Sequence, residues 1–281
     1  MDEISLLASK QKPMQDHAQR RAKRATLVFT TSVIVLALAM SEQSRSFAQA
    51  AAPANQSHQL TVRVPFVGCA SDGQAGPAKA PPGTSKVVAI SSEIAPRLAY
   101  YKAKYGSGTL APRGWHCFGT YGSNGSNLYV SPNPIADPIF LSHWAGFTGP
   151  AVQVSDVLGG TSGRFEVAEI IARVFPAHMA FVKSVIAEGI QPASSFPRGP
   201  YQGDRLTYLS KEVVEYETPA NQSGLGTVSQ LKKNGSPIRG VSILTGKTPN
   251  LTHLSVRLPL DATDLGPVII RQTEHDATHV N

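Results

Sequence analysis

The sequence predicts an α+β domain with a mostly antiparallel sheet, two or three packed helices and one disulfide. Short apolar segments with strand-like alternation outnumber helical ones, and the two kinds do not alternate regularly as they would in a parallel α/β fold. Gly- and Pro-rich segments separate the apolar ones, as turns between antiparallel strands do. Two cysteines, Cys69 and Cys117, supply one bridge.

The N-terminal 50 residues have the three parts of a secretory signal peptide. A cationic block at 20–24 precedes an apolar run at 25–40, and the A-x-A pattern of residues 48–50 follows. The alternative is an N-terminal membrane anchor, for which the run is short. At about 1.5 Å per residue it spans ~24 Å, against a hydrocarbon core of ~30 Å.

The expected organisation is therefore a signal peptide at 1–50, a disordered leader at 51–59 and a single α+β domain at 60–281. Cleavage after Ala50 removes seven of the 26 Lys+Arg and four of the 19 Asp+Glu, which leaves a net charge of +4. The remaining cations are scattered, whereas nucleic-acid-binding proteins cluster them on one face. We therefore expect an extracytoplasmic protein, periplasmic or secreted, with no nucleic-acid partner.

Within the domain, alternation predicts a first strand at 60–67. Residues 70–85 are rich in Gly, Pro and Ser and predict a loop, and 86–90 predict a short strand. The serines at 91–92 can cap a helix that runs to about residue 104, since Ile94, Leu98 and Tyr101 then share one face.

The middle of the domain is less regular. Two short strands should flank the Gly-rich turn at 119–126, and the four prolines of 131–150 predict irregular structure. Residues 151–157 and 164–175 suggest a hairpin around a Gly-rich turn, but the apolar spacing of 164–175 also fits a helical face. Helix and strand both stay open for that segment.

The last third predicts a helix, a loop, three strands and a final helix. Residues 177–188 form an amphipathic pattern that ends at Gly189, and a loop follows at 192–201. Asp261 or Thr263 can cap the final helix. The expected strands are 206–218, 237–244 and 251–258.

The two cysteines are expected to pair. Free thiols in an oxidising compartment would be exposed to oxidation, so Cys69 and Cys117 should form a disulfide with their Cα atoms within ~7 Å. The bridge would close a loop of 48 residues and hold the segment around 113–121.

A candidate contact surface lies beside the expected bridge. It consists of Asp72, Arg113, Trp115, His116 and Tyr121. Arginine and aromatic side chains on a constrained loop are typical of binding surfaces. The alternative is that these aromatics belong to a core around a structural disulfide.

Three short patterns resemble site motifs without completing them. The stretch 240–248 has five residues between its glycines where a phosphate-binding loop has four, and the S-x-x-K of 229–232 lacks a following K-T-G. His275 and His279 are four residues apart and could share a metal on a helix, but at the chain end a solvated tail is the expectation. We expect no cofactor and no metal site.

The chain resembles an uncharacterised family of exported bacterial proteins over most of the mature chain. This resemblance implies export and a single-domain layout, and carries no activity and no site residue. The segments that carry it are VRVPFVGC at 62–69, LAPRGWHCFGTYGS at 110–123, SSFP…GPY at 194–201 and VVEYETPA at 213–220.

Two functions remain open. The first is an exported binding module for an envelope component, a small ligand or a protein, with membrane contact only through an uncleaved signal segment. The second is an extracytoplasmic hydrolase whose site is assembled from distant residues such as Asp72, His116 or Ser123. The absence of a local catalytic motif in the sequence favours the first.

Overall fold

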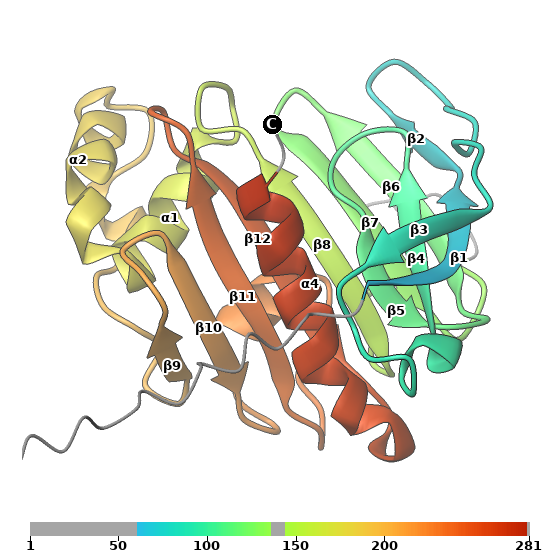
Figure 1. Cartoon of the computed structure of the whole chain (residues 1–281). Helices are drawn as coiled ribbons and strands as arrows, with labels where there is room; N and C mark the ends of the chain where they lie inside the picture. The colour runs from blue at the N-terminus through green and yellow to red at the C-terminus, as the bar shows by residue number, and fades with distance from the viewer. Residues whose placement is uncertain (1–60, 136–143, 280–281) are drawn as a thin grey trace, which may run out of the picture. The chain divides into compact units, whose positions relative to one another are not determined.

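The computed structural model describes residues 61–135 and 144–279, which belong to one compact unit that spans Gln56–Asn281. An eight-stranded sheet crosses this unit (Figure 1). All its neighbouring strands are antiparallel except the β2–β6 pair. In spatial order its strands are β2 (Ser71–Gly73), β6 (His116–Gly122), β7 (Gly125–Ser131), β8 (Ala151–Val157), β12 (Asn250–Arg257), β11 (Ile238–Thr245), β10 (Val213–Thr218) and β9 (Arg205–Tyr208).

A second sheet of four strands packs against the β6–β7 half of the large sheet. Its β1–β4 pair is parallel and the other pairs are antiparallel. In spatial order its strands are β3 (Ser85–Val88), β1 (Val62–Cys69), β4 (Leu98–Ala103) and β5 (Thr109–Pro112). The fold is thus α+β and mostly antiparallel, as the sequence predicts.

The helices cover both faces of the large sheet. Helix α4 (Gly266–His279) follows the 3₁₀ turn η4 (Leu260–Leu265) and lies over β11 and β12, beside the small sheet (Figure 1). On the opposite face lie α1 (Arg164–Val174) and α2 (Met179–Ala187). The shorter elements are η1 (Ala95–Arg97), η2 (Pro176–His178), η3 (Ala193–Ser195) and α3 (Leu225–Val228).

Strand β12 separates two apolar cores. Leu254 and Val256 face a core shared by the small sheet and α4, whereas Leu251 faces the core under α1 and α2. The alternation follows from the two-residue period of a strand. Because both faces are covered, seven of its eight residues are buried. Within the described residues, no helix has the length and apolar character needed to cross a bilayer.

Arg257 ends β12 with an unusual burial for a charged side chain, at 2% exposure. Nη2 of its guanidinium donates to the backbone oxygen of Phe147 at 2.7 Å, and Nε donates to that of Gly149 at 2.9 Å. Nη1 donates to the backbone oxygen of Lys232. A buried charge is tolerated when its donors are satisfied. Arg257 therefore fixes two loops, around 147–149 and around Lys232, against the end of the sheet.

The predicted disulfide is confirmed. Cys69 and Cys117 are bonded, with 5.5 Å between their Cα atoms. Cys69 ends β1 of the small sheet, and Cys117 lies in β6 of the large sheet. The bridge therefore joins the two sheets covalently.

The helix predicted at 91–104 is wrong. The short turn η1 contains Pro96, and the chain then runs as β4 between β1 and β5. Leu98, Tyr100 and Tyr101 are all buried, so both faces of this segment are apolar. A continuous apolar run with two tyrosines is typical of a central strand that is buried on both faces. Burial of the segment in the sheet therefore determines its structure, although the spacing of its apolar residues also fits a helix.

Two other segments differ from expectation, and the alternative left open for 164–175 is settled as the helix. Residues 164–175 are largely the helix α1, so the hairpin suggested with β8 does not form. The strand predicted at 206–218 is a hairpin of β9 and β10 with a turn at 209–212. The loop 70–85 contains the short strand β2. The signal peptide and leader lie outside the described residues, as does 136–143.

The turn expected at 119–126 is confined to residues 123–124, because β6 and β7 extend into that range from both sides. The remaining elements agree with the sequence patterns. The 177–188 helix is formed by η2 and α2, and the final helix by η4 and α4. The strands predicted at 237–244 and 251–258 are β11 and β12 with boundaries shifted by one residue.

We expect reduction of the disulfide to lower the free energy of unfolding by up to about 4 kcal/mol, the chain-entropy value for a loop of this length. Urea unfolding of the oxidised protein, and of the double variant Cys69→Ala with Cys117→Ala, measures the difference. Equal midpoints would show that packing alone holds the two sheets together.

Candidate functional site

The structure does not bring the candidate contact residues together. Arg113, Trp115 and His116 lie at the start of β6, whereas Tyr121 lies near its end and Asp72 pairs beside it through β2. At about 3.3 Å per residue, His116 and Tyr121 lie ~17 Å apart along this strand. The five residues therefore form two separate clusters, one on each side of the disulfide.

The aromatic members of these clusters make internal contacts. Trp115 is half-buried against the core of the small sheet, and its backbone N–H donates to the Tyr101 hydroxyl at 3.1 Å. Tyr121 donates to the backbone oxygen of Gly76, and its ring lies 4.2 Å from that of Tyr105. These contacts give both residues a structural role, while Arg113 and His116 remain exposed.

The dispersed hydrolase residues are also divided. Ser123 lies in the turn after β6, on the side of Asp72, and its hydroxyl is 3.2 Å from that of Ser162. His116 lies at the opposite end of β6. A serine and its base must be within hydrogen-bond reach, so these three residues do not form a catalytic unit.

A serine–histidine contact does exist elsewhere, on the face of the large sheet that α1 covers. His253 Nδ1 is 2.9 Å from the Ser242 hydroxyl, and its Nε2 is 3.0 Å from the Tyr216 hydroxyl. The Tyr216 and His253 rings stack at 5.3 Å. Burial lowers the pKa of His253 to about 4 and raises that of Tyr216.

This network is structural. Ser242 is 0% exposed and His253 4% exposed, so a substrate cannot reach them without local opening of the fold. The hydrogen bonds satisfy polar groups that would otherwise be buried unpaired. The sequence offers no local motif for it, because its members come from three different strands.

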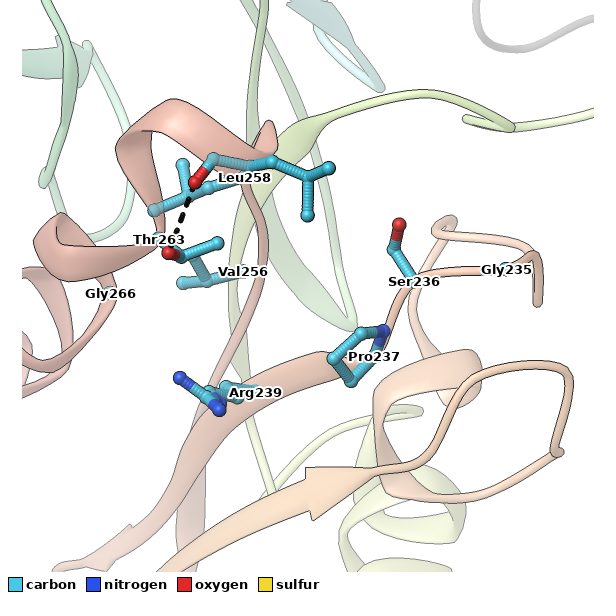
Figure 2. Close-up of a pocket in the computed structure, with 9 residues that line it drawn as sticks. Gly235, Ser236, Pro237, Arg239, Val256, Leu258, Thr263 and Gly266 are labelled. Carbon is cyan, nitrogen blue, oxygen red and sulfur yellow. Dashed lines mark hydrogen bonds between the residues drawn. The ribbon is translucent and has the colours of Figure 1, made fainter.

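An accessible cavity lies at the start of β11, opposite η4 and the beginning of α4. Its volume is about 240 Å³. Figure 2 shows Pro237 and Arg239 on one side, facing Val256, Leu258 and Thr263 on the other. The lining is apolar on the Leu258 side and charged on the Arg239 side.

A second cavity of about 380 Å³ shares Arg239 with the first. It lies between the β9–β10 hairpin and the flank of α4, where Pro267, Ile270 and Arg271 line it. We call the two cavities together the arginine groove. Their shared residue, Arg239, stands between an apolar part and a polar part.

An ion-pair chain positions the Arg239 side chain. Glu217 accepts from Arg205 Nη1 at 2.6 Å through one oxygen and from Arg239 Nε at 2.7 Å through the other. This is the only hydrogen bond of the Arg239 guanidinium among the described residues, and it leaves both Nη groups for a ligand. Arg239 is half-exposed, with 46% of its side chain accessible.

Two carboxyl groups, Glu215 and Glu274, face each other beside the groove. The pKa of Glu274 is raised to about 7, first by burial and then by the charge of Glu215. Near neutral pH the pair therefore holds less than two negative charges. The positive charge of Arg205, Arg239 and Arg271 therefore exceeds the negative charge of Glu215, Glu217 and Glu274 below pH 7.

Sequence reasoning missed the arginine groove. Arg205, Arg239 and Arg271 are separated by more than thirty residues each and belong to no motif. In the sequence, each of these arginines only lies beside an apolar strand or helix pattern. Charged residues are common at such solvent-exposed positions, so this placement does not indicate a site.

Comparison of the chain with protein-family models, with curated protein sequences and with solved structures finds no match. Among the described residues, no group of three or more His, Cys, Asp or Glu side chains is placed to hold a metal ion.

The raised pKa of Glu274 predicts a pH-dependent stability. The folded chain binds this proton more tightly than the unfolded chain, so the free energy of unfolding falls as pH rises from about 4.5 to about 7. Glu274→Gln should therefore raise the melting temperature at pH 8 and leave it nearly unchanged at pH 4.5. Glu93→Gln, at an exposed loop position, is the matched control. An equal effect of Glu274→Gln at both pH values would contradict the shift.

Proposed function

We propose that this protein is an exported, disulfide-bonded binding module that takes an anionic ligand with an apolar part in the arginine groove. The observation that carries the proposal is the position of Arg239. Its guanidinium lies where an apolar cavity and a charged cavity meet, with both Nη groups unpaired among the described residues.

The apolar end of the groove favours a ligand with a hydrocarbon part. Val256 and Leu258 line it, and Leu260 at its rim is 90% exposed. A ligand that covers this exposed leucine would bind more tightly, because burying apolar surface contributes roughly 25 cal/mol per Å² to the free energy of binding.

The charged end favours an acidic group. A guanidinium presents two parallel N–H donors that match the two oxygens of a carboxylate, phosphate or sulfonate. Glu217 accepts a hydrogen bond from Arg239 Nε, which fixes the plane of the guanidinium. Because the side chain is already ordered, it loses less conformational entropy when a ligand binds.

Binding fits the groove better than hydrolysis does. The groups that could act as a general base there are Glu215 and Glu217. Glu217 is paired with two arginines, and Glu215 lies against Glu274. Neither is placed to activate a nucleophile or water.

Export is supported by the N-terminal pattern and by the compartment that a disulfide requires. The Cys69–Cys117 bridge is compatible with an oxidising extracytoplasmic space. The cationic block, apolar run and A-x-A pattern of residues 20–50 supply the export signal.

We expect the mature protein to begin at Ala51. Periplasmic and culture-medium fractions of an expressing Gram-negative host, followed by N-terminal sequencing, check this. A membrane-bound protein whose N-terminus precedes Ala25 would instead show a retained anchor.

We expect Arg239→Ala to weaken binding of 8-anilinonaphthalene-1-sulfonate at least tenfold, because this probe combines an apolar ring system with a sulfonate. Fluorescence titration measures it. Arg198→Ala, at an exposed loop arginine outside the groove, is the matched control and should bind as the wild type does.

Competition separates the two halves of the ligand. Octanoate should displace the probe from the wild type, and octanol should do so much more weakly. Equal displacement by both, or equal affinity of Arg239→Ala and wild type, would contradict an arginine-dependent anion site.

A further inference from the structure

A cavity of about 510 Å³ lies between the end of α4 and the small sheet. Asp276 is the one carboxylate among the described residues of its lining, and the ring of Tyr100 forms part of its wall. Four side chains of the lining can carry positive charge, namely Lys86 of β3, Lys102 of β4, and His275 and His279 of α4. The cavity therefore gathers more cationic groups than carboxylates.

The two histidines stand one turn apart at the end of α4, and both are exposed. Their exposure agrees with the solvated tail expected from the sequence, although the segment is helical. His279 Nδ1 lies 2.9 Å from the backbone oxygen of His275, and His275 Nδ1 lies 3.6 Å from Asp276 Oδ1. Both contacts use Nδ1, so each Nε2 has no hydrogen-bond partner among the described residues. A protonated Nε2 can therefore donate to a ligand.

The two lysines also keep donors for a ligand. Lys86 Nζ lies 5.3 Å from the centroid of the Tyr100 ring and makes no hydrogen bond within the described part of the chain. Lys102 donates to the backbone oxygen of Gly106, and an ammonium group has three hydrogens. Burial lowers the pKa of Lys102, and the charge of Asp156 opposes this shift. A bound anion would likewise stabilise the charged form of Lys102.

The carboxylates near the cavity already have donors from the protein. Asp276 accepts from the Tyr100 hydroxyl and from Gln272 Nε2, both at 2.8 Å. Asp156 accepts from the Ser107 hydroxyl at 2.9 Å. The oxygens of both aspartates are therefore engaged, whereas the lysines and imidazoles keep hydrogens for a ligand.

The charge of this cavity depends on pH. Lys86 and Lys102 reach it from the small sheet, and the charges of Asp156 and Asp276 nearly balance them when the imidazoles are neutral. Imidazole rings gain a proton in mildly acidic solution, and the C-terminal end of a helix favours their cationic form. The two rings stack with 4.5 Å between centroids, so two charges there would repel each other. An anion in the cavity would offset this repulsion.

We propose that this cavity binds a small molecule with a phosphate or sulfate group, and that it does so most tightly in mildly acidic solution. Such a group presents several oxygens, so donors from four side chains can each reach a different one. The cavity has room for an organic part, which can lie against the Tyr100 ring. The site is separate from the arginine groove and does not depend on the function proposed for it.

Phenyl sulfate is the probe, because its single negative charge does not change between pH 5.5 and pH 8. The titration uses the Arg239→Ala variant, so that the arginine groove does not contribute. Calorimetry should show one site per chain, with at least tenfold higher affinity at pH 5.5 than at pH 8. Loss of affinity at high salt should accompany binding, since the contacts are between charged groups.

Two double variants in the same background separate the roles of the cations. Lys86→Gln with Lys102→Gln should weaken binding at least tenfold at both pH values. His275→Gln with His279→Gln should abolish the gain at pH 5.5 and leave the affinity at pH 8 unchanged. The matched controls are Lys79→Gln and His116→Gln, at exposed positions outside this lining. Circular dichroism of each variant separates loss of the site from loss of the fold.

Phenyl phosphate distinguishes the two ligand classes. Tighter binding of phenyl phosphate than of phenyl sulfate at pH 8 would indicate a phosphate ester, and the reverse order a sulfate ester. Absence of saturable binding of both probes at pH 5.5 would overturn the proposal. Unchanged affinity in the lysine variant would also overturn it, as would equal affinity at both pH values before the histidines are replaced.

Discussion

The burial of β12 on both of its faces determines where the other layers lie. An antiparallel strand usually has one face in water, but both faces of β12 are buried: Leu254 and Val256 point to one apolar core, while Leu251 points to the other, beside the buried His253. The sheet must therefore be covered twice, by α4 and the small sheet on one side and by α1 and α2 on the other. Arg257 ends the strand and donates hydrogen bonds to the backbone oxygens of Phe147 and Gly149 in the loop beside it.

Helix α4 separates two of the accessible cavities that the described residues line. Val268, Ile269 and Ile270 place it on the core, and its polar flanks then face opposite neighbours. One flank borders the arginine groove with Arg271, and the other ends at the histidine pair beside the small sheet. A single apolar stripe thus positions two chemically different surfaces, one rich in guanidinium groups and one in imidazoles.

The sequence predicts the fold class, the disulfide and the long regular elements, because these depend on local patterns. Strands β11 and β12 and helices α2 and α4 carry clear periodicity. The errors occur where a tertiary contact overrides spacing, as at β4, whose tyrosines pack between two strands. The arginine groove could not be predicted, since Arg205 and Arg239 meet only through the pairing of β9, β10 and β11.

The disulfide also changes what a protease can remove. Lys79 is exposed in the long connection between β2 and β3, and cleavage there would separate β1 and β2 from the rest of the backbone. The Cys69–Cys117 bond would still hold the released segment to β6. A nicked molecule would therefore keep all its strands, and the cut would be visible only after reduction. In a compartment rich in proteases, this one bond would let the protein keep its fold after cleavage in the loop.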